Sequence, residues 1–171
     1  DMTWEDGSRQ HHGVVASPLY RREAAARVAA LVEHLEDKFG DHMAGYHPCG
    51  QNTGEWFYQD TWEKLLNGYA PADTGAWRDW LRARYRTDAA LQAAWHEPGA
   101  TLDKATIPTP GQRRASPNGI LRDPATEKAL IDFAAFQQQA MADLVCELAH
   151  AVRQASHGRK LVTFFYGYLF E

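Results

Sequence analysis

Two short apolar segments, residues 43–47 and 161–166, are the stretches of this 171-residue chain that read as strands. Each follows a longer stretch in which apolar residues recur every three or four positions, the spacing of an amphipathic helix. The first segment runs into a polar, glycine-containing loop over residues 48–56. A helix, a buried strand and a polar loop in that order are typical of a parallel α/β fold.

Helical patterns cover most of the remaining chain. Serine or aspartate followed by proline marks a helix start, and glycine marks a helix end. These signals and the apolar spacing predict helices over 17–40, 60–68, 77–85, 87–95 and 123–158. Residues 96–122 lack the pattern and contain four prolines and three glycines. This segment is predicted to be a long loop within the domain, because loops of that length in compact domains are usually functional or disordered.

The shortage of strands suggests that this is an excerpt of a larger fold. A strand in a parallel sheet needs neighbours on both sides, and the helices need a sheet to cover. We therefore expect residues 1–171 to form a single partial domain of an α/β protein, rich in helix. The alternative is a mainly helical domain with a minor two-stranded sheet, which needs no missing parts.

Charge and hydropathy exclude several classes of partner and location. The net charge is −4 and the pI is near 6.1, so no nucleic-acid or anionic-membrane partner is expected. No apolar run approaches the roughly 18 residues of a membrane span. The acidic N-terminus lacks the features of a signal peptide, so the protein is either intracellular or has lost a processed leader, with a cytoplasmic location slightly favoured.

The aromatic content allows two interpretations. Six Trp, seven Tyr and seven Phe make 12% of the chain aromatic. Aromatic side chains supply large apolar area, so a well-filled core explains them. They also form the walls of sugar-binding clefts, where flat rings stack on the C–H faces of pyranoses. Composition alone favours the core.

Glu55 is the candidate catalytic residue. It lies beyond the first predicted strand, where reactive residues of α/β folds gather, after Gly54 and beside Trp56 and Tyr58. Aromatic neighbours solvate a carboxylate poorly, so we expect a raised pKa for Glu55, as a general acid requires. The simpler alternative is that Glu55 forms a cap or an ion pair on the surface of a connecting loop.

Metal and cofactor sites are not expected. His47 and Cys49 could ligate zinc, but no second pair follows at a suitable spacing, and two cysteines in all are too few for a disulfide framework. The chain also has no glycine-rich phosphate loop, nucleophile elbow or HExxH pattern. These absences argue against nucleotide-dependent and serine-hydrolase chemistry.

Several short motifs together resemble a known family. They are Gly7-Ser8-Arg9, Ser17-Pro18-Leu19-Tyr20-Arg21, Gly45-Tyr46-His47 leading to Glu55-Trp56, Trp77-Arg78-Asp79-Trp80-Leu81, Ala94-Trp95, Ile107-Pro108 and Leu121-Arg122-Asp123. In this order they resemble the middle of glycoside hydrolase family 42 β-galactosidases, over most of the chain.

The resemblance implies a fold and a reaction. It implies a portion of a (β/α)8 barrel with 43–47 and 161–166 as strands four and five. Glu55 would be the acid/base of a retaining β-glycosidase, and the nucleophile would lie beyond Glu171. The expected partner is a carbohydrate, with no cofactor, and oligomers are left open. The chain alone is expected to be inactive.

The resemblance also implies which residues bind substrate. They are the aromatic side chains Tyr46, Trp56 and Tyr58 and the polar side chains His47 and Asn52. One departure stands out, because the family places Asn directly before the acid/base Glu. Here Gly54 stands in that place and Asn52 comes two residues before it.

Two other classes of function remain open from the residues alone. A non-catalytic carbohydrate-binding or scaffold domain would use the aromatic residues to bind sugar without a carboxylate pair. A helical interaction protein would use them as core, and Glu55 would be fully exposed.

Overall fold

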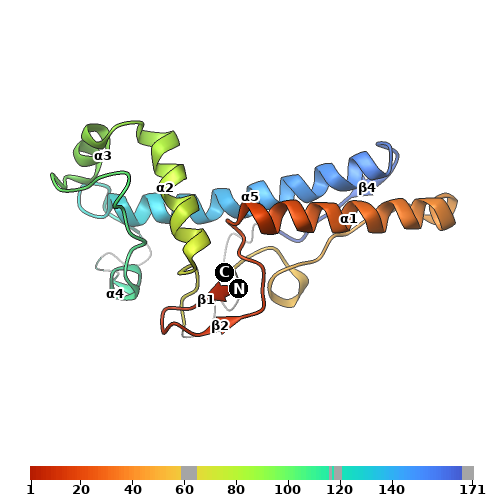
Figure 1. Ribbon diagram of the computed structural model, residues 1–171, viewed down its shortest axis with the longest axis horizontal. Helices are drawn as coiled ribbons and strands as arrows, with labels where there is room; N and C mark the ends of the chain where they lie inside the picture. The colour runs from red at the N-terminus through yellow and green to blue at the C-terminus, as the bar shows by residue number, and fades with distance from the viewer. Residues whose placement is uncertain (59–64, 116, 118–120, 167–171) are drawn as a thin grey trace. The chain divides into compact units, whose positions relative to one another are not determined.

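The computed structural model describes residues 1–58, 65–115, 117 and 121–166 (Figure 1). Its elements are β1 (Met2–Thr3), β2 (Arg9–Gln10), α1 (Pro18–Phe39), η1 (Gly40–His42), β3 (Gly45–Tyr46), η2 (Asn52–Gly54), α2 (Pro71–Tyr85), α3 (Asp88–Trp95), α4 (Pro110–Arg114), α5 (Lys128–Ala155) and β4 (Leu161–Val162). They form two compact units. The first unit contains residues 1–14 and 68–139, and the second contains residues 15–67 and 140–171.

Helix α1 in the second unit has the predicted boundaries. The Ser17 hydroxyl accepts a hydrogen bond from the backbone N–H of Tyr20, and Pro18 occupies the first turn. Gly40 caps the other end, where its N–H donates to the carbonyl of Glu36. The capping residues thus satisfy backbone groups that a helix leaves unpaired at its ends.

The second unit also contains the two predicted strands. β3 pairs in parallel with β4, with Gly45 opposite Leu161. Gly45 is required for this close approach, because a Cβ at that position would lie 2.6 Å from the Leu161 carbonyl oxygen. Tyr46 and Val162 pack against a small core formed by Val32, Val152 and Ala155, from α1 and α5.

The strands are shorter and more exposed than predicted. Each ladder contains two residues, and Ala44, His47 and Leu161 are exposed, Leu161 by 71%. Successive side chains of a strand point to opposite faces. The face that carries Tyr46 and Val162 is covered by the helices, and the other face is exposed in the described part of the chain.

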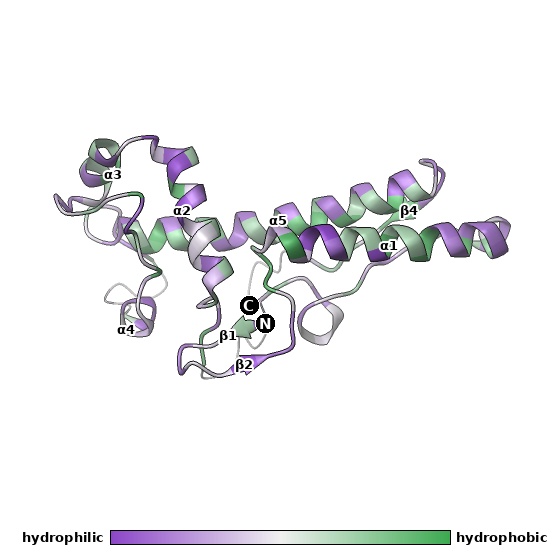
Figure 2. Cartoon of the chain, in the orientation of Figure 1, coloured by the Kyte–Doolittle hydropathy of each residue, from purple (hydrophilic) through white to green (hydrophobic). Residues whose placement is uncertain are grey.

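Helix α5 begins later than the Asp-Pro signal predicts. Residues 124–126 form a turn in which Asp123 accepts from the N–H groups of Ala125 and Glu127, and the helix starts at Lys128. The signal therefore marks a hydrogen-bonded turn in front of the helix. Figure 2 shows hydrophobic and hydrophilic residues alternating along α5, as expected of an amphipathic helix.

The first unit has an aromatic core. Trp77 of α2 is fully buried, and its ring lies 5.4–6.1 Å from four others, those of Trp80, Trp95, Phe133 and Phe136. These rings come from α2, α3 and the first part of α5. The core interpretation of the aromatic content is therefore correct for this group.

Helix α2 ends at the predicted residue but begins at Pro71, six residues before the predicted start. Three other segments differ from the predictions or test them only in part. The N-terminal residues, for which no regular element was predicted, contain the antiparallel pair of β1 and β2. The predicted loop over 96–122 contains α4, which begins with a capping box between Thr109 and Gln112. Asp60 and Glu63 of the predicted helix over 60–68 lie outside the described residues, and residues 65–68 are not helical.

Among the described residues, no helix is both long and apolar enough to cross a membrane.

Candidate active site

Glu55 lies at the edge of the small sheet where both parallel strands end. The loop after β3 returns to β4, because the Trp56 N–H donates to the Phe165 carbonyl at 2.9 Å and Trp56 forms a parallel bridge with Tyr166. Both of these partners follow β4 in the chain. Glu55, directly before Trp56, is therefore held at the carboxyl ends of β3 and β4, the edge at which α/β folds place reactive groups.

The loop in front of Glu55 turns through left-handed backbone. Gln51, Thr53 and Gly54 have φ values of 54°, 53° and 89°. Glycine adopts this region freely, whereas a β-branched residue such as threonine does so rarely. The turn reverses the chain within a few residues and directs it back to the sheet.

Trp56 anchors the loop from inside. Its side chain is 2% exposed, and its indole N–H donates to the carbonyl of Pro48 at 2.9 Å. A Cβ at Gly50 would lie 2.5 Å from the indole ring, so only glycine allows the backbone to pass there. Trp56 is thus positioned to hold the backbone next to Glu55, with its own ring enclosed.

Tyr46 points to the helix side of the sheet. Its hydroxyl donates to the Glu36 carboxylate of α1 at 2.5 Å. Burial, together with this negatively charged partner, raises the pKa of Tyr46 to about 12. Glu36 also forms ion pairs with Arg159 and Lys160, at 3.3 and 3.6 Å. Tyr46 therefore belongs to a polar group that ties β3 to α1.

His47 points to the opposite face, as strand alternation requires. Its Nδ1 lies 2.9 Å from the Thr163 hydroxyl, and its ring contacts Phe165 edge-on at 4.7 Å. Thr163 and Phe165 were not among the predicted site residues. The signal for them is the alternation along 161–166, which places both on one side of the strand, away from Val162 and Phe164.

The family of the chain follows from its sequence profile. Residues 1–171 match the profile of glycoside hydrolase family 42, whose description is β-galactosidase. The chain belongs to this family. A β-galactosidase from Thermus thermophilus is 36% identical over 91 residues, which are 52% of this chain and 12% of that relative. The family 42 chain thus spans a small part of the curated relative that it matches.

Solved structures agree with a partial glycosidase fold. The catalytic domain of β-amylase from Paenibacillus polymyxa superposes with a TM-score of 0.72 at 15% identity, covering 95% of this chain and 41% of that one. β-Galactosidase from Marinomonas ef1 superposes with a TM-score of 0.65 at 21% identity, covering 94% of this chain and 23% of that one. These neighbours are TIM-barrel glycosidases. The predicted fold class is confirmed at this level, with few strands and many helices in the family 42 chain.

The structure describes the remaining predicted site residues less completely. Glu55 and Tyr58 are half-buried, and both take part in further interactions. Asn52 begins η2, and its side chain lies outside the described part of the structure. Among the described residues, no group of three or more His, Cys, Asp or Glu side chains is arranged to hold a metal ion. The edge thus offers a carboxyl group, an imidazole and a hydroxyl group for general acid/base chemistry and hydrogen bonding.

Proposed function

We propose that the full-length protein is a retaining β-glycosidase of the β-galactosidase type, with Glu55 as its general acid/base. The observation that supports this most is the return of the Glu55 loop to the carboxyl ends of two adjacent parallel strands through the Trp56 bridge. Membership of family 42 agrees with it. We assign β3 and β4 to strands four and five of the barrel.

The proposed reaction uses the Glu55 carboxyl group twice, first as a proton donor and then as a proton acceptor. Glu55 protonates the glycosidic oxygen as the leaving group departs, and it then accepts a proton from the water that releases the sugar. A second carboxylate, about 5–5.5 Å away, attacks the anomeric carbon in such enzymes. We assign that nucleophile to a part of the protein outside residues 1–171.

The other site residues receive different roles in this proposal. His47 and Tyr58 contact the sugar, and Asn52 bonds one of its hydroxyl groups. Trp56 holds the loop, which its enclosed ring and its bond to Pro48 support. Tyr46 acts indirectly, by fixing β3 to α1 through Glu36.

A leaving-group series tests the role of Glu55. In the full-length protein, Glu55→Gln is expected to slow hydrolysis of alkyl β-galactosides, which need a proton, by about 10²–10⁴-fold. Aryl galactosides with acidic phenols need little protonation, so their bond cleavage is expected to be much less affected. The rates are measured as kcat/KM for both substrate types.

Glu33→Gln, an exposed residue on α1, is the matched control and is expected to leave both rates unchanged. Equal losses for the two substrate types would contradict acid catalysis by Glu55. Sugar binding without turnover in the unmodified protein would instead support the non-catalytic carbohydrate-binding alternative.

A further inference from the structure

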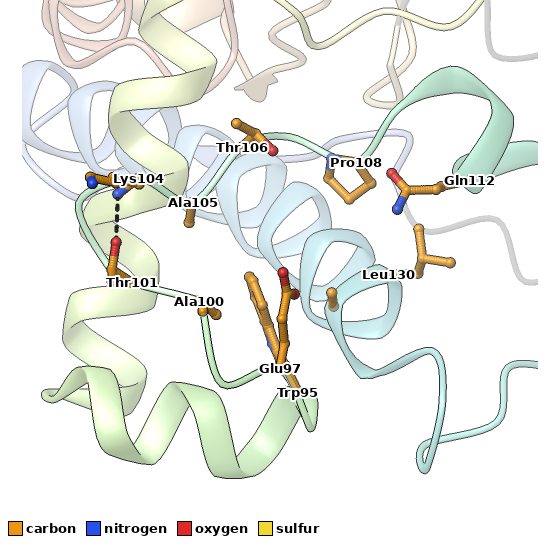
Figure 3. Close-up of a pocket in the computed structure, with 12 residues that line it drawn as sticks. Trp95, Glu97, Ala100, Thr101, Lys104, Ala105, Thr106, Pro108, Gln112 and Leu130 are labelled. Atoms are coloured by element: carbon orange, nitrogen blue, oxygen red, sulfur yellow. Dashed lines mark hydrogen bonds between the residues drawn. The ribbon is translucent and has the colours of Figure 1, made fainter.

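The first unit contains a cavity that the proposed reaction does not use. Its volume is about 220 Å³, and it is lined by residues of the loop after α3, of α4 and of the start of α5 (Figure 3). Trp95, Pro108 and Leu130 supply apolar walls. At about 30 Å³ per water molecule, the space equals that of about seven waters, enough for one small ring with polar substituents.

The Trp95 side chain is held in place by contacts within the protein. The Trp95 indole N–H donates to the Asp132 carboxylate at 2.8 Å, and the ring stacks on Trp77 at 6.1 Å with an interplanar angle of 15°. Asp132 is 1% exposed and also accepts from the Tyr85 hydroxyl at 2.5 Å. A ligand that contacts Trp95 therefore meets a wall that needs no reordering, which lowers the entropic cost of binding.

Polar groups approach the same space from two sides. Figure 3 shows the Glu97 carboxylate rising beside the Trp95 ring, with Thr106 and Gln112 across from them. The Gln112 side-chain oxygen accepts from the Thr109 backbone N–H and hydroxyl, at 2.8 and 3.0 Å, so its amide nitrogen is the group that it can offer to a ligand. The Lys104 amino group also lines the space. The cavity thus presents an acceptor, two donors and a hydroxyl group that can both donate and accept.

We infer that this cavity binds one neutral sugar ring. The C–H face of the ring packs on Trp95, and its hydroxyl groups bond to Glu97, Thr106 and Gln112. A purely apolar ligand would remove the Glu97 carboxylate from water without a partner, which is costly. The lining carries one negative side chain, Glu97, and one positive side chain, Lys104, so neither an anion nor a cation gains a net attraction. Glu55 is not among the lining residues, so the inference is independent of the proposed reaction.

Titration by NMR tests the inference. D-Galactose and D-glucose are added to the ¹⁵N-labelled full-length protein, and the indole N–H of Trp95 is assigned by its loss in Trp95→Phe. We expect saturable shifts of that signal and of the 97–106 amides for at least one sugar, with a dissociation constant of about 1 mM. Glu97→Gln is expected to weaken binding about tenfold, because it replaces a charged acceptor with a neutral one. Thr106→Val is expected to weaken it about threefold, because it removes the hydroxyl group.

Both substituted side chains are exposed, and the Thr106 carbonyl that accepts from Trp77 stays in place, so both variants are expected to fold. Circular dichroism melting checks this. Glu33→Gln and Glu55→Gln are expected to leave the shifts unchanged, and the second separates this cavity from the proposed active site. No saturable shift with either sugar, or shifts that survive both Glu97→Gln and Thr106→Val, would overturn the inference.

Discussion

Asp132 illustrates what single residues contribute that the sequence pattern hides. It lies in the helical run of α5 between apolar neighbours, yet it is 1% exposed. Tyr85 and Trp95 donate hydrogen bonds to it, and Lys128 forms an ion pair with it. A buried carboxylate is stable only when its oxygens are paired in this way. Its partners lie up to 47 positions away in the chain, so no local motif predicts the group.

Asp73 is a second buried carboxylate, and it makes stability depend on pH. It accepts a hydrogen bond from the Ala70 N–H, but burial raises the pKa of Asp73 from 3.8 to about 6. Between these two pH values the folded state binds more protons than the unfolded state. The free energy of unfolding is therefore expected to fall as pH rises from about 4 to 6, and to stay level above that range.

The size of this change is set by the shift in the pKa of Asp73. Two pKa units at 1.36 kcal/mol each correspond to about 3 kcal/mol. Urea unfolding at a series of pH values measures it, and Asp73→Asn is expected to remove most of the slope between pH 4 and 6. An unchanged slope in the variant would assign the pH dependence to other groups.

At the scale of elements, local sequence signals predicted the ends of helices better than they predicted which residues are buried. The Ser-Pro start and Gly end of α1 are correct because a cap acts on residues within one turn. Helix α3 also has the predicted boundaries, with Thr87 as its cap. The lengths of β3 and β4 and the start of α5 differ from the predicted ones, because these depend on which segments pack together. Enclosure of the Trp56 ring beneath Gly50 depends on packing in the same way.

Gly50→Ala tests how tightly the loop before Glu55 is packed. The new methyl group would lie 2.5 Å from the Trp56 indole, so the ring or the loop must move. We expect a loss of about 1–3 kcal/mol in the free energy of unfolding, as for overpacked cores, and a changed tryptophan emission. Gly99→Ala is the matched control, because a Cβ there meets nothing within 4 Å. Equal stability of the two variants would show that the loop adjusts freely.

At the scale of the whole molecule, the sequence indicated the fold class and the position of Glu55. Two helix–strand pairs and a polar loop were sufficient for a parallel sheet, which the structure contains. The directions of the side chains at the site were harder to predict from the sequence. Tyr46 and Trp56 were expected to face a substrate, and the structure places their polar groups on Glu36 and Pro48. Composition does not indicate the direction of a side chain.

Amide hydrogen exchange is expected to differ strongly between the helices and the small sheet. Leu144 and Leu148 of α5 are at most 2% exposed, whereas Leu161 of β4 is 71% exposed. Exchange follows local opening, which is easier where few apolar contacts must break. The N–H of Leu161 donates to Ala44, directly before β3, and the N–H of Thr163 donates to Tyr46 of β3. We expect both groups to exchange faster than the N–H groups of Leu144 and Leu148. Similar rates would mean that sheet and helix open together.

The left-handed turn before Glu55 has a consequence for how such a protein evolves. Thr53 is β-branched and has a φ of 53°, a conformation that costs roughly 1–3 kcal/mol and that asparagine or glycine adopts more readily. Asparagine or glycine at position 53 is therefore expected to be more stable. Under the proposed role of Glu55, the strain at Thr53 lowers stability in exchange for the position of that carboxyl group, so substitutions that raise heat resistance would be sought elsewhere than in residues 51–54.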